Sequence, residues 1–204
     1  MIDVLPKIPE FLSRPSVASS RRAPAPERVL ATLLFTDLVG STAMAVQLGP
    51  RWAELLREHN ARIRRALANH SARVIDTAGD GFFASNFRRP ACAIECACAI
   101  RECVSELGLQ VRIGVHTGEC ELVEGKLAGL AVVIGARVAA HAEGGEVLVS
   151  RTVKDLVAGS GIEFEPRGTP DLKGLGEWAL YAVASADREP ECPGAFAGSI
   201  PAAG

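Results

Sequence analysis

Hydrophobic and polar positions recur along the chain with two periods, and these periods predict the order of strands and helices. Residues 28–36 form an almost continuous apolar run, which is typical of a buried strand. Residues 42–69 then carry apolar side chains every three or four positions, which predicts a helical region that breaks near Gly49-Pro50. The arginines outside its apolar face indicate a solvated surface rather than a phosphate site; they are Arg57, Arg62, Arg64 and Arg65.

The next segments predict a hairpin and a second long helix. Strands at 72–77 and 82–87 flank a turn at 78–81, where Asp80-Gly81 supplies the positive φ of a tight turn. Pro90 begins a helix that extends to about residue 107. The remaining predicted elements are a strand at 111–119 with a second arm at 121–123, a loop at 124–129, a helix at 130–142, a strand at 146–149, a short helix at 151–157 capped by Ser150, and β segments near 164–167 and 178–183.

This order predicts an α+β fold. The sequence β-α-β-β-α-β is typical of a ferredoxin-like split βαβ (βαββαβ) unit, an antiparallel sheet with helices on one face, here followed by C-terminal α/β additions. We expect one domain over residues 28–184. Residues 1–27 are rich in Pro, Ser, Ala and Arg and predict a disordered tail or linker, and residues 185–204 predict a second disordered tail.

Composition narrows the class of protein. The 204 residues are 48% hydrophobic and 23% charged, with a net charge of −2, which is typical of a soluble globular protein and gives no basic character for nucleic acid. The six cysteines form no zinc-type pair of CxxC clusters, so buried thiols are favoured over a metal site. Reduced cysteines and the lack of a signal peptide favour the cytoplasm, and no apolar run is long enough to predict a membrane span.

The end of the first strand is a candidate site. Asp37 closes the apolar run and is followed by Gly40, Ser41 and Thr42, which open the next helix. Gly40 lets the backbone approach a ligand, Ser41 or Thr42 can cap the helix, and the free N–H groups of its first turn face an anion. A carboxylate beside an anion cradle suggests a divalent metal that holds a phosphate. The alternative is an Asp that only caps a helix.

Asp80 in the hairpin turn is the second candidate carboxylate. In a split βαβ sheet the first strand lies centrally beside the third, so Asp37 and Asp80 can converge at one edge. Two convergent carboxylates would hold one or two hard cations, most simply magnesium. The alternative is that Asp80 is only a turn residue.

Several spaced motifs together resemble class III nucleotidyl cyclases, bacterial type. FTDLVGST at 35–42 looks like the metal-binding signature of that family, and TAGDG at 77–81 resembles its second signature. Further matches follow in the expected order: VHTGE at 115–119, the helix with Arg137, GEVLVS at 145–150 and LKG at 172–174. A weaker match, Glu10-Phe11-Leu12, resembles the tail of a hydrolase-like partner domain, which implies an upstream partner domain.

The resemblance implies a reaction and a set of site residues. Asp37, Asp80 and the main chain of Leu38 would bind two ions, Mg²⁺ or Mn²⁺; one activates the ribose 3′-hydroxyl and the other holds the triphosphate. The backbone of Leu38, Val39, Gly40, Ser41 and Thr42 would cradle the β- and γ-phosphates. Arg137 matches the arginine that stabilises the transition state, and Lys173 matches the lysine that meets the triphosphate. Without the resemblance, both would be surface residues. Such sites form between two subunits, which implies a head-to-tail homodimer with active sites at the interface.

Three positions depart from the family pattern. Adenylate cyclases carry Lys where this chain has Asp76, and Asp or Thr where we align Lys126; the transition-state Asn is here Val133. A carboxylate and an ammonium exchanged in this way complement guanine, with its N1 donor and O6 acceptor, better than adenine. The alternative is drift, with Asp76 and Lys126 paired to each other or directed to solvent.

We therefore expect a class III cyclase that converts ATP or GTP to a 3′,5′-cyclic nucleotide and pyrophosphate. Val133 removes a hydrogen-bond donor of the transition state, which predicts weak activity. The alternative is a degenerate cyclase-fold regulatory or dimerisation module that binds nucleotide with little or no turnover.

Overall fold

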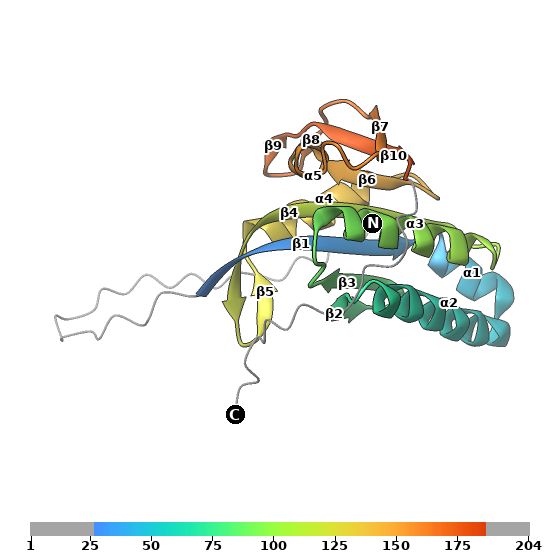
Figure 1. The fold of residues 1–204 in the computed structure, drawn as a ribbon. Helices are drawn as coiled ribbons and strands as arrows, with labels where there is room; N and C mark the ends of the chain where they lie inside the picture. Colours follow the sequence, from blue (N-terminus) through green and yellow to red (C-terminus); the bar gives the residue numbers. More distant parts are fainter. Residues whose placement is uncertain (1–26, 187–204) are drawn as a thin grey trace, which may run out of the picture.

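An eight-stranded sheet organises the protein, and its strand β1 lies between β3 and β4. A computed structural model describes residues 27–186. The strand order of the sheet is β2-β3-β1-β4-β6-β10-β7, with β5 paired to β4, and β8 and β9 form a separate two-stranded sheet (Figure 1). All pairs of the large sheet are antiparallel except β4 with β6.

The element bounds agree with most of the sequence prediction. The strands are β1 Glu27–Leu38, β2 Arg73–Ala78, β3 Gly81–Ser85, β4 Val111–Val123, β5 Lys126–Ala128, β6 Val147–Ser150, β7 Glu163–Pro166, β8 Asp171–Leu172, β9 Gly176–Glu177 and β10 Leu180–Ser185. The helices are α1 Ser41–Leu48, α2 Pro50–Asn69, α3 Pro90–Ser105, α4 Leu130–His141 and α5 Arg151–Leu156.

Strand β1 is apolar on both faces because both faces are covered. Leu34 and Leu38 are buried in the large core cluster that contains α2 and α3 side chains, whereas Leu33 belongs to a smaller cluster with Ala131 of α4. Neighbouring residues of a strand point to opposite faces, so β1 joins two cores. Phe35 stacks on Phe83 of β3, with ring centroids 4.4 Å apart, on the α4 face.

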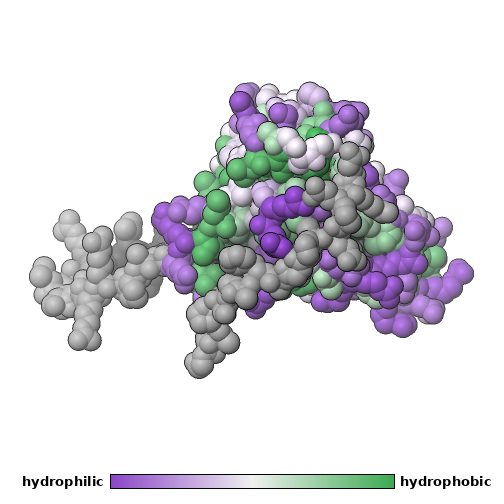
Figure 2. Space-filling view, viewed as in Figure 1, coloured by the Kyte–Doolittle hydropathy of each residue, from purple (hydrophilic) through white to green (hydrophobic). Residues whose placement is uncertain are grey.

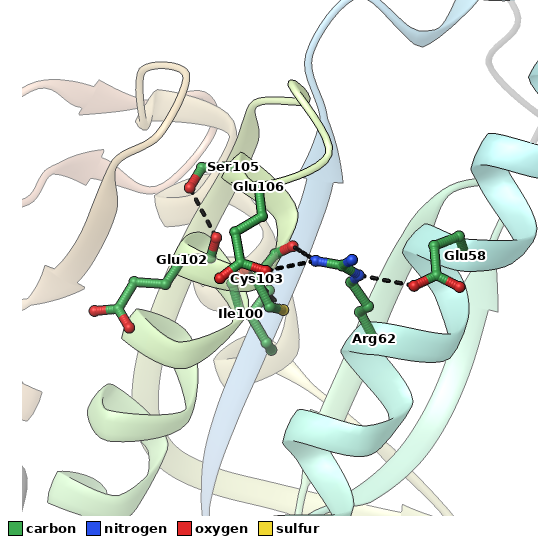
Figure 3. Close-up of polar contacts among 7 residues, drawn as sticks. All are labelled: Glu58, Arg62, Ile100, Glu102, Cys103, Ser105 and Glu106. Atoms are coloured by element: carbon green, nitrogen blue, oxygen red, sulfur yellow. Dashed lines mark hydrogen bonds and ion pairs between the residues drawn. The ribbon is translucent and has the colours of Figure 1, made fainter.

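Helices α2 and α3 lie on one face of the sheet and are joined by Arg62. Its guanidinium donates to Glu58 of its own helix at 2.8 Å, and to the Cys103 carbonyl and Glu106 in and after α3 at 2.9 and 2.7 Å (Figure 3). This arginine therefore connects two helices rather than facing a phosphate. Three cysteines of α3 are free thiols, of which Cys96 is fully buried and Cys98 and Cys103 are partly buried. Cys92 of the same helix is disulfide-bonded, so the expectation of reduced cysteines is wrong for this residue.

Helix α4 lies on the opposite face, where glycines of β4 let it approach closely. A Cβ at Gly114 would lie 2.3 Å from the backbone nitrogen of Ala139, and one at Gly118 would lie 2.8 Å from Cβ of Ala131. A Cβ at Gly135 of α4 would likewise lie only 2.6 Å from the Phe35 ring. These three glycines set α4 directly against β1 and β4.

The predicted α+β split βαβ fold is confirmed, with local corrections. The two core helices share one face as expected, and α4 covers the other. Residues 126–128 form β5 rather than a loop, and β8 and β9 were not predicted. The predicted side-chain caps are wrong: α1 begins after Gly40 with no side-chain cap, and Ser150 makes no cap bond to α5. The predicted tails at 1–27 and 185–204 lie almost entirely outside the described residues.

A candidate metal and phosphate site at the edge of the sheet

Asp37 lies at the C-terminal end of β1 with a basic residue directly opposite. Asp37 pairs in register with Arg112 of β4, and the Arg112 Nη2 atom donates to the Asp37 Oδ2 atom. Both side chains are partly exposed, with Asp37 48% and Arg112 34% accessible. By strand alternation they lie on the same face as Leu33 and Phe35, the face that α4 covers in part.

The β2–β3 turn brings Asp80 to the same edge. Thr36 pairs with Phe82, and the Phe82 N–H donates to the Thr36 hydroxyl at 3.1 Å. Gly81 has no room for a side chain, because a Cβ there would lie 2.9 Å from the Thr36 carbonyl. The positive φ of this turn belongs to Gly79 and not to the Asp80-Gly81 pair. The turn is thus pressed against the residue that precedes Asp37.

Asp80 has a buried carboxylate oxygen that no group of the described protein satisfies. Its Oδ2 atom has no hydrogen-bond partner. A buried, unsatisfied carboxylate oxygen is costly, and a cation is the partner that would relieve that cost. The alternative in which Asp80 serves only as a turn residue leaves this atom unexplained.

The segment between β1 and α1 forms a turn with free backbone donors. The Val39 N–H donates to the Gln110 carbonyl at 2.9 Å, which ties the turn to the start of β4. Gly40 has φ 68° and is the N-cap residue of α1, with no side-chain cap bond. The N–H groups of the first helical turn, beginning at Ser41, have no intrahelical acceptor, so they remain available to an anion.

The donor set at this edge fits a hard divalent cation. Asp37 and Asp80 supply carboxylate oxygens, which magnesium and manganese prefer over nitrogen or sulfur. Within residues 27–186, no three His, Cys, Asp or Glu side chains gather around one point. The remaining ligands would therefore be main-chain oxygen at Leu38, water and the phosphates themselves, which is usual for magnesium bound with a nucleotide.

Arg112 is a site residue that the sequence interpretation missed. Its Nε atom is buried and has no hydrogen-bond partner among residues 27–186, and its Nη2 atom contacts Asp37. The strand prediction placed Arg112 in the run 111–119, but only the register with β1 shows that it lies opposite Asp37. Sequence alternation alone could have flagged a charged residue in an otherwise buried strand.

His59 of α2 is a second residue with an unexplained polar atom near Asp80. The imidazole is fully buried, its Nδ1 atom lies 3.1 Å from the Asn60 side-chain oxygen, and its Nε2 atom has no partner within the described part of the chain. Burial lowers the pKa of His59, against the smaller raising effects of the Asn60 hydrogen bond and the Asp80 carboxylate. His59 is therefore a neutral ring beneath the carboxylate turn.

The two expected base-contacting residues are exposed and do not pair with each other. Asp76 lies opposite Phe83 on β3, hence on the α4 face, and its Oδ1 atom accepts the Thr77 N–H at 2.9 Å. Lys126 lies at the start of β5, opposite Val123. In the part of the chain between residues 27 and 186 no ion pair joins Asp76 to Lys126. One alternative, a mutual ion pair, is therefore not seen.

The residues expected to act in the transition state lie on other elements. Val133 and Arg137 are exposed on α4, and Lys173 is exposed in the β8–β9 turn. No hydrogen bond or ion pair between described residues joins any of them to Asp37 or Asp80. One chain thus presents two separate groups of site residues.

His116, in the predicted 115–119 motif, is a buried structural residue. It is 3% exposed, its Nδ1 atom lies 2.8 Å from the Ser150 hydroxyl, and its ring meets the edge of Trp178. Burial lowers its pKa to about 4. This contact also explains why Ser150 does not cap α5, because its hydroxyl is already engaged.

Comparison with known proteins connects these features to one family. A family model described as "Adenylate and Guanylate cyclase catalytic domain" matches residues 25–185. Among curated proteins, the chain is 27% identical over 165 residues to "Putative adenylate cyclase 3" of Rhizobium meliloti, covering 72% of this chain and 27% of that protein. The chain spans less than half the length of the curated relatives it matches.

Two solved structures share the fold. The adenylyl cyclase CyaB from P. aeruginosa aligns with a TM-score of 0.73 at 19% identity, covering 80% of this chain and 98% of that chain. The guanylate cyclase domain of RhGC from Catenaria anguillulae, solved in complex with GTP, aligns with a TM-score of 0.71 at 16% identity, covering 78% and 99%. At these identities the similarity establishes the architecture alone. Between residues 27 and 186, no helix is long and apolar enough to cross a membrane.

The buried histidines predict that the protein loses stability in mild acid. Because burial lowers the pKa of His116 to about 4, the unfolded chain binds a proton below its ordinary value of about 6.5 while the folded chain does not. The free energy of unfolding should therefore fall as pH drops from about 6.5 toward 4, by about 3 kcal/mol from this group. His59, whose pKa is also lowered, acts in the same direction.

Urea denaturation at pH 7, 6, 5 and 4.5 would measure this dependence. His116→Asn can keep a hydrogen bond to Ser150 and should be less stable at pH 7 but flatter across the series, with His59 leaving a residual slope. An unchanged slope in the variant would show that His116 is not the responsible group.

Proposed function

The chain belongs to the adenylate and guanylate cyclase catalytic domain family, and on this premise we propose that residues 28–184 form a class III nucleotidyl cyclase. It would convert a nucleoside triphosphate, ATP or GTP, to the 3′,5′-cyclic nucleotide and pyrophosphate. The observation that supports the proposal is the strand register that brings Asp37 and the unsatisfied Asp80 oxygen to the same end of the sheet as the turn at 38–42. A cytoplasmic location is part of the same proposal.

We call Asp37, Asp80, the turn at 38–42 and Arg112 the metal half of the site, and each of these groups has a role in the proposed reaction. Asp37, Asp80 and the Leu38 main chain would hold two ions, Mg²⁺ or Mn²⁺, which supply Lewis-acid activation of the 3′-hydroxyl and charge neutralisation at the phosphates. The Val39 N–H already donates to the Gln110 carbonyl. The remaining backbone N–H groups of the turn, up to Thr42, would donate hydrogen bonds to the β- and γ-phosphate oxygens. Arg112, whose fork of donors suits phosphate, would face the same oxygens from β4.

The second half of the site stabilises the transition state and reads the base. Arg137 would donate to the α-phosphate as the 3′-oxygen attacks and the pyrophosphate oxygen departs, and Lys173 would meet the triphosphate. Asp76 and Lys126 would face the purine edge. Among residues 27–186, no hydrogen bond or ion pair joins these residues to the two carboxylates, which is compatible with a site completed by a second subunit.

An exposed apolar surface near this second half supports a head-to-tail homodimer. Figure 2 shows a hydrophobic area where β4 and β5 lie in Figure 1. The exposed large apolar residues of β1, β4 and the start of α4 are Leu30, Val123, Leu130 and Val133, of which Leu30 lies on the sheet face opposite to α4 by strand alternation. Leu30 is 76% and Leu130 is 62% exposed. Apolar side chains at this exposure favour contact with a partner, and we propose that the second subunit covers them.

Val133 supports the second candidate function, a module that binds nucleotide with little or no turnover. Its side chain is 44% exposed on α4, one turn before Arg137, and offers no hydrogen bond. The residues that we propose for metal binding, Asp37 and Asp80, are both present, which supports nucleotide binding without efficient catalysis as the alternative. The choice between the two functions therefore depends on a measurement of turnover.

Purified protein should form a cyclic nucleotide from ATP or GTP in the presence of Mn²⁺. Asp37→Ala removes a carboxylate that no other group of the described chain replaces, so product should fall at least about a hundredfold. Liquid chromatography of the reaction would quantify the cyclic product and pyrophosphate. Wild-type protein that forms no more product than Asp37→Ala, while still binding nucleotide, would favour the module.

The exchanged charges should favour guanine. An Asp76 carboxylate accepts from the guanine N1–H, and a Lys126 ammonium donates to O6, so kcat/KM should be higher for GTP than for ATP. The double variant Asp76→Lys with Lys126→Asp should shift this ratio toward ATP, by about tenfold or more. A strong ATP preference in the wild type contradicts the assignment, and an unchanged ratio in the double variant places both residues outside the base site.

Restoring a hydrogen-bond donor at position 133 should raise turnover. Val133→Asn places an amide one turn before Arg137, and kcat should increase by about ten- to a hundredfold with little change in KM, because the contact forms in the transition state. Val133→Ala is the matched control, since it removes the apolar bulk without adding a donor. Equal rates for the two variants would rule out a transition-state contact at this position.

A further inference from the structure

The Asp37–Arg112 ion pair places a fixed positive charge on a proposed metal ligand. Arg112 Nη2 donates to the Asp37 Oδ2 atom, and the two residues are direct partners across β1 and β4. The Arg112 Nε atom is buried, and no described residue accepts a hydrogen bond from it. The guanidinium is therefore bound to Asp37 through its Nη2 atom, while its Nε–H donor remains without a hydrogen bond among the described residues.

A divalent ion on Asp37 would have to share that carboxylate with the guanidinium. Two positive centres on one carboxylate repel each other, and their repulsion is strong where solvent screening is limited by burial. Arg112 is only 34% exposed, so water and salt screen it incompletely. In the protein without nucleotide, Arg112 should thus weaken the binding of the ion.

The triphosphate offers Arg112 a different anion. The turn at 38–42 lies beside the start of β4, since Val39 donates to the Gln110 carbonyl two residues before Arg112. Phosphate oxygens in that turn would lie within the reach of an arginine side chain from Arg112. The unsatisfied Nε donor would then gain an acceptor, and Asp37 would be released to the ion.

We propose that Arg112 is a competing counter-ion that keeps the metal affinity of the empty site low and releases Asp37 when a triphosphate binds. This inference rests on the proposed function, because it assumes that Asp37 is a metal ligand. Metal and triphosphate then bind cooperatively, and by linkage each increases the affinity for the other by the same factor. Arg112 is a positioning residue for Asp37 in the empty protein.

The test measures Mn²⁺ binding alone, without nucleotide, by the electron paramagnetic resonance signal of the free ion. Arg112→Gln should bind Mn²⁺ about tenfold more tightly than the wild type, because the competing charge is gone. Arg112→Lys keeps the charge and should bind like the wild type. Arg112→Met, which keeps the apolar stem, tests the same loss of charge if the Gln variant folds poorly, as judged by circular dichroism.

Two controls separate this effect from a general change in charge. Arg28→Gln removes an arginine that pairs with Glu119 and Glu121 across the same two strands at their other end, and it should leave Mn²⁺ affinity unchanged. Replacing Arg112 by Gln in an Asp37→Asn background should also have no effect on Mn²⁺ binding, because the shared carboxylate is gone.

The outcomes distinguish this inference from the proposed function. Measurable Mn²⁺ binding that is equal or weaker in Arg112→Gln overturns the competition and leaves the metal site intact. Tighter binding in both Arg112→Gln and Arg28→Gln also overturns it, since charge alone would then explain the change. No Mn²⁺ binding by the wild type or by either neutral Arg112 variant overturns the metal site and this inference together.

Discussion

The antiparallel pairing of β1 with both β3 and β4 is the constraint on which the rest of the structure depends. It sets Thr36 against Phe82 and thereby brings the Asp80 turn to the end of β1, and it sets Asp37 against Arg112. A shift of one residue in either register would move Asp37 to the face covered by α2 and α3. The register is held by apolar side chains on both faces, with Leu34 in one core and Leu33 in the other.

Glycines allow other segments to pack closely against these paired strands at two places. Gly81 lets the carboxylate turn press on the Thr36 carbonyl, and Gly114 lets α4 lie on β4 with a spacing that no side chain permits. The first contact brings Asp80 to the end of β1, where we propose the metal site, and the second positions the helix that carries Val133 and Arg137. Both groups of proposed site residues therefore depend on the same strands, although no hydrogen bond or ion pair among residues 27–186 joins them.

The fold was predictable because its signals are local. Apolar periodicity identified β1, α2 and α3, and the Gly49-Pro50 break separated α1 from α2 at the expected place. The unexpected β5 strand is three residues long, too short for a period to appear, and is stabilised by pairing with β4. The failed caps at Ser41 and Ser150 have different causes. Gly40 opens α1 in a left-handed conformation, and Ser150 is engaged by His116.

The candidate site was predictable to the extent that motif spacing identifies residues. Asp37 and Asp80 follow from motifs and from the strand order of a split βαβ sheet. Arg112 and His59 do not, because their proximity to these carboxylates arises from strand register and from the packing of α2. A contact between residues 75 positions apart leaves no periodic signal in either segment.

The proposed division of the site between two surfaces bears on the three positions that depart from the cyclase family pattern. No hydrogen bond or ion pair among residues 27–186 joins Val133, Asp76 or Lys126 to Asp37, Asp80 or Arg112. Effects of distant sites with no shared partner add, which means that affinity for metal and triphosphate can persist while turnover or base preference varies. If the proposed site residues are correct, the chain would combine a retained phosphate and metal surface with an altered base and transition-state surface. In a head-to-tail dimer, each active site would draw one surface from each subunit.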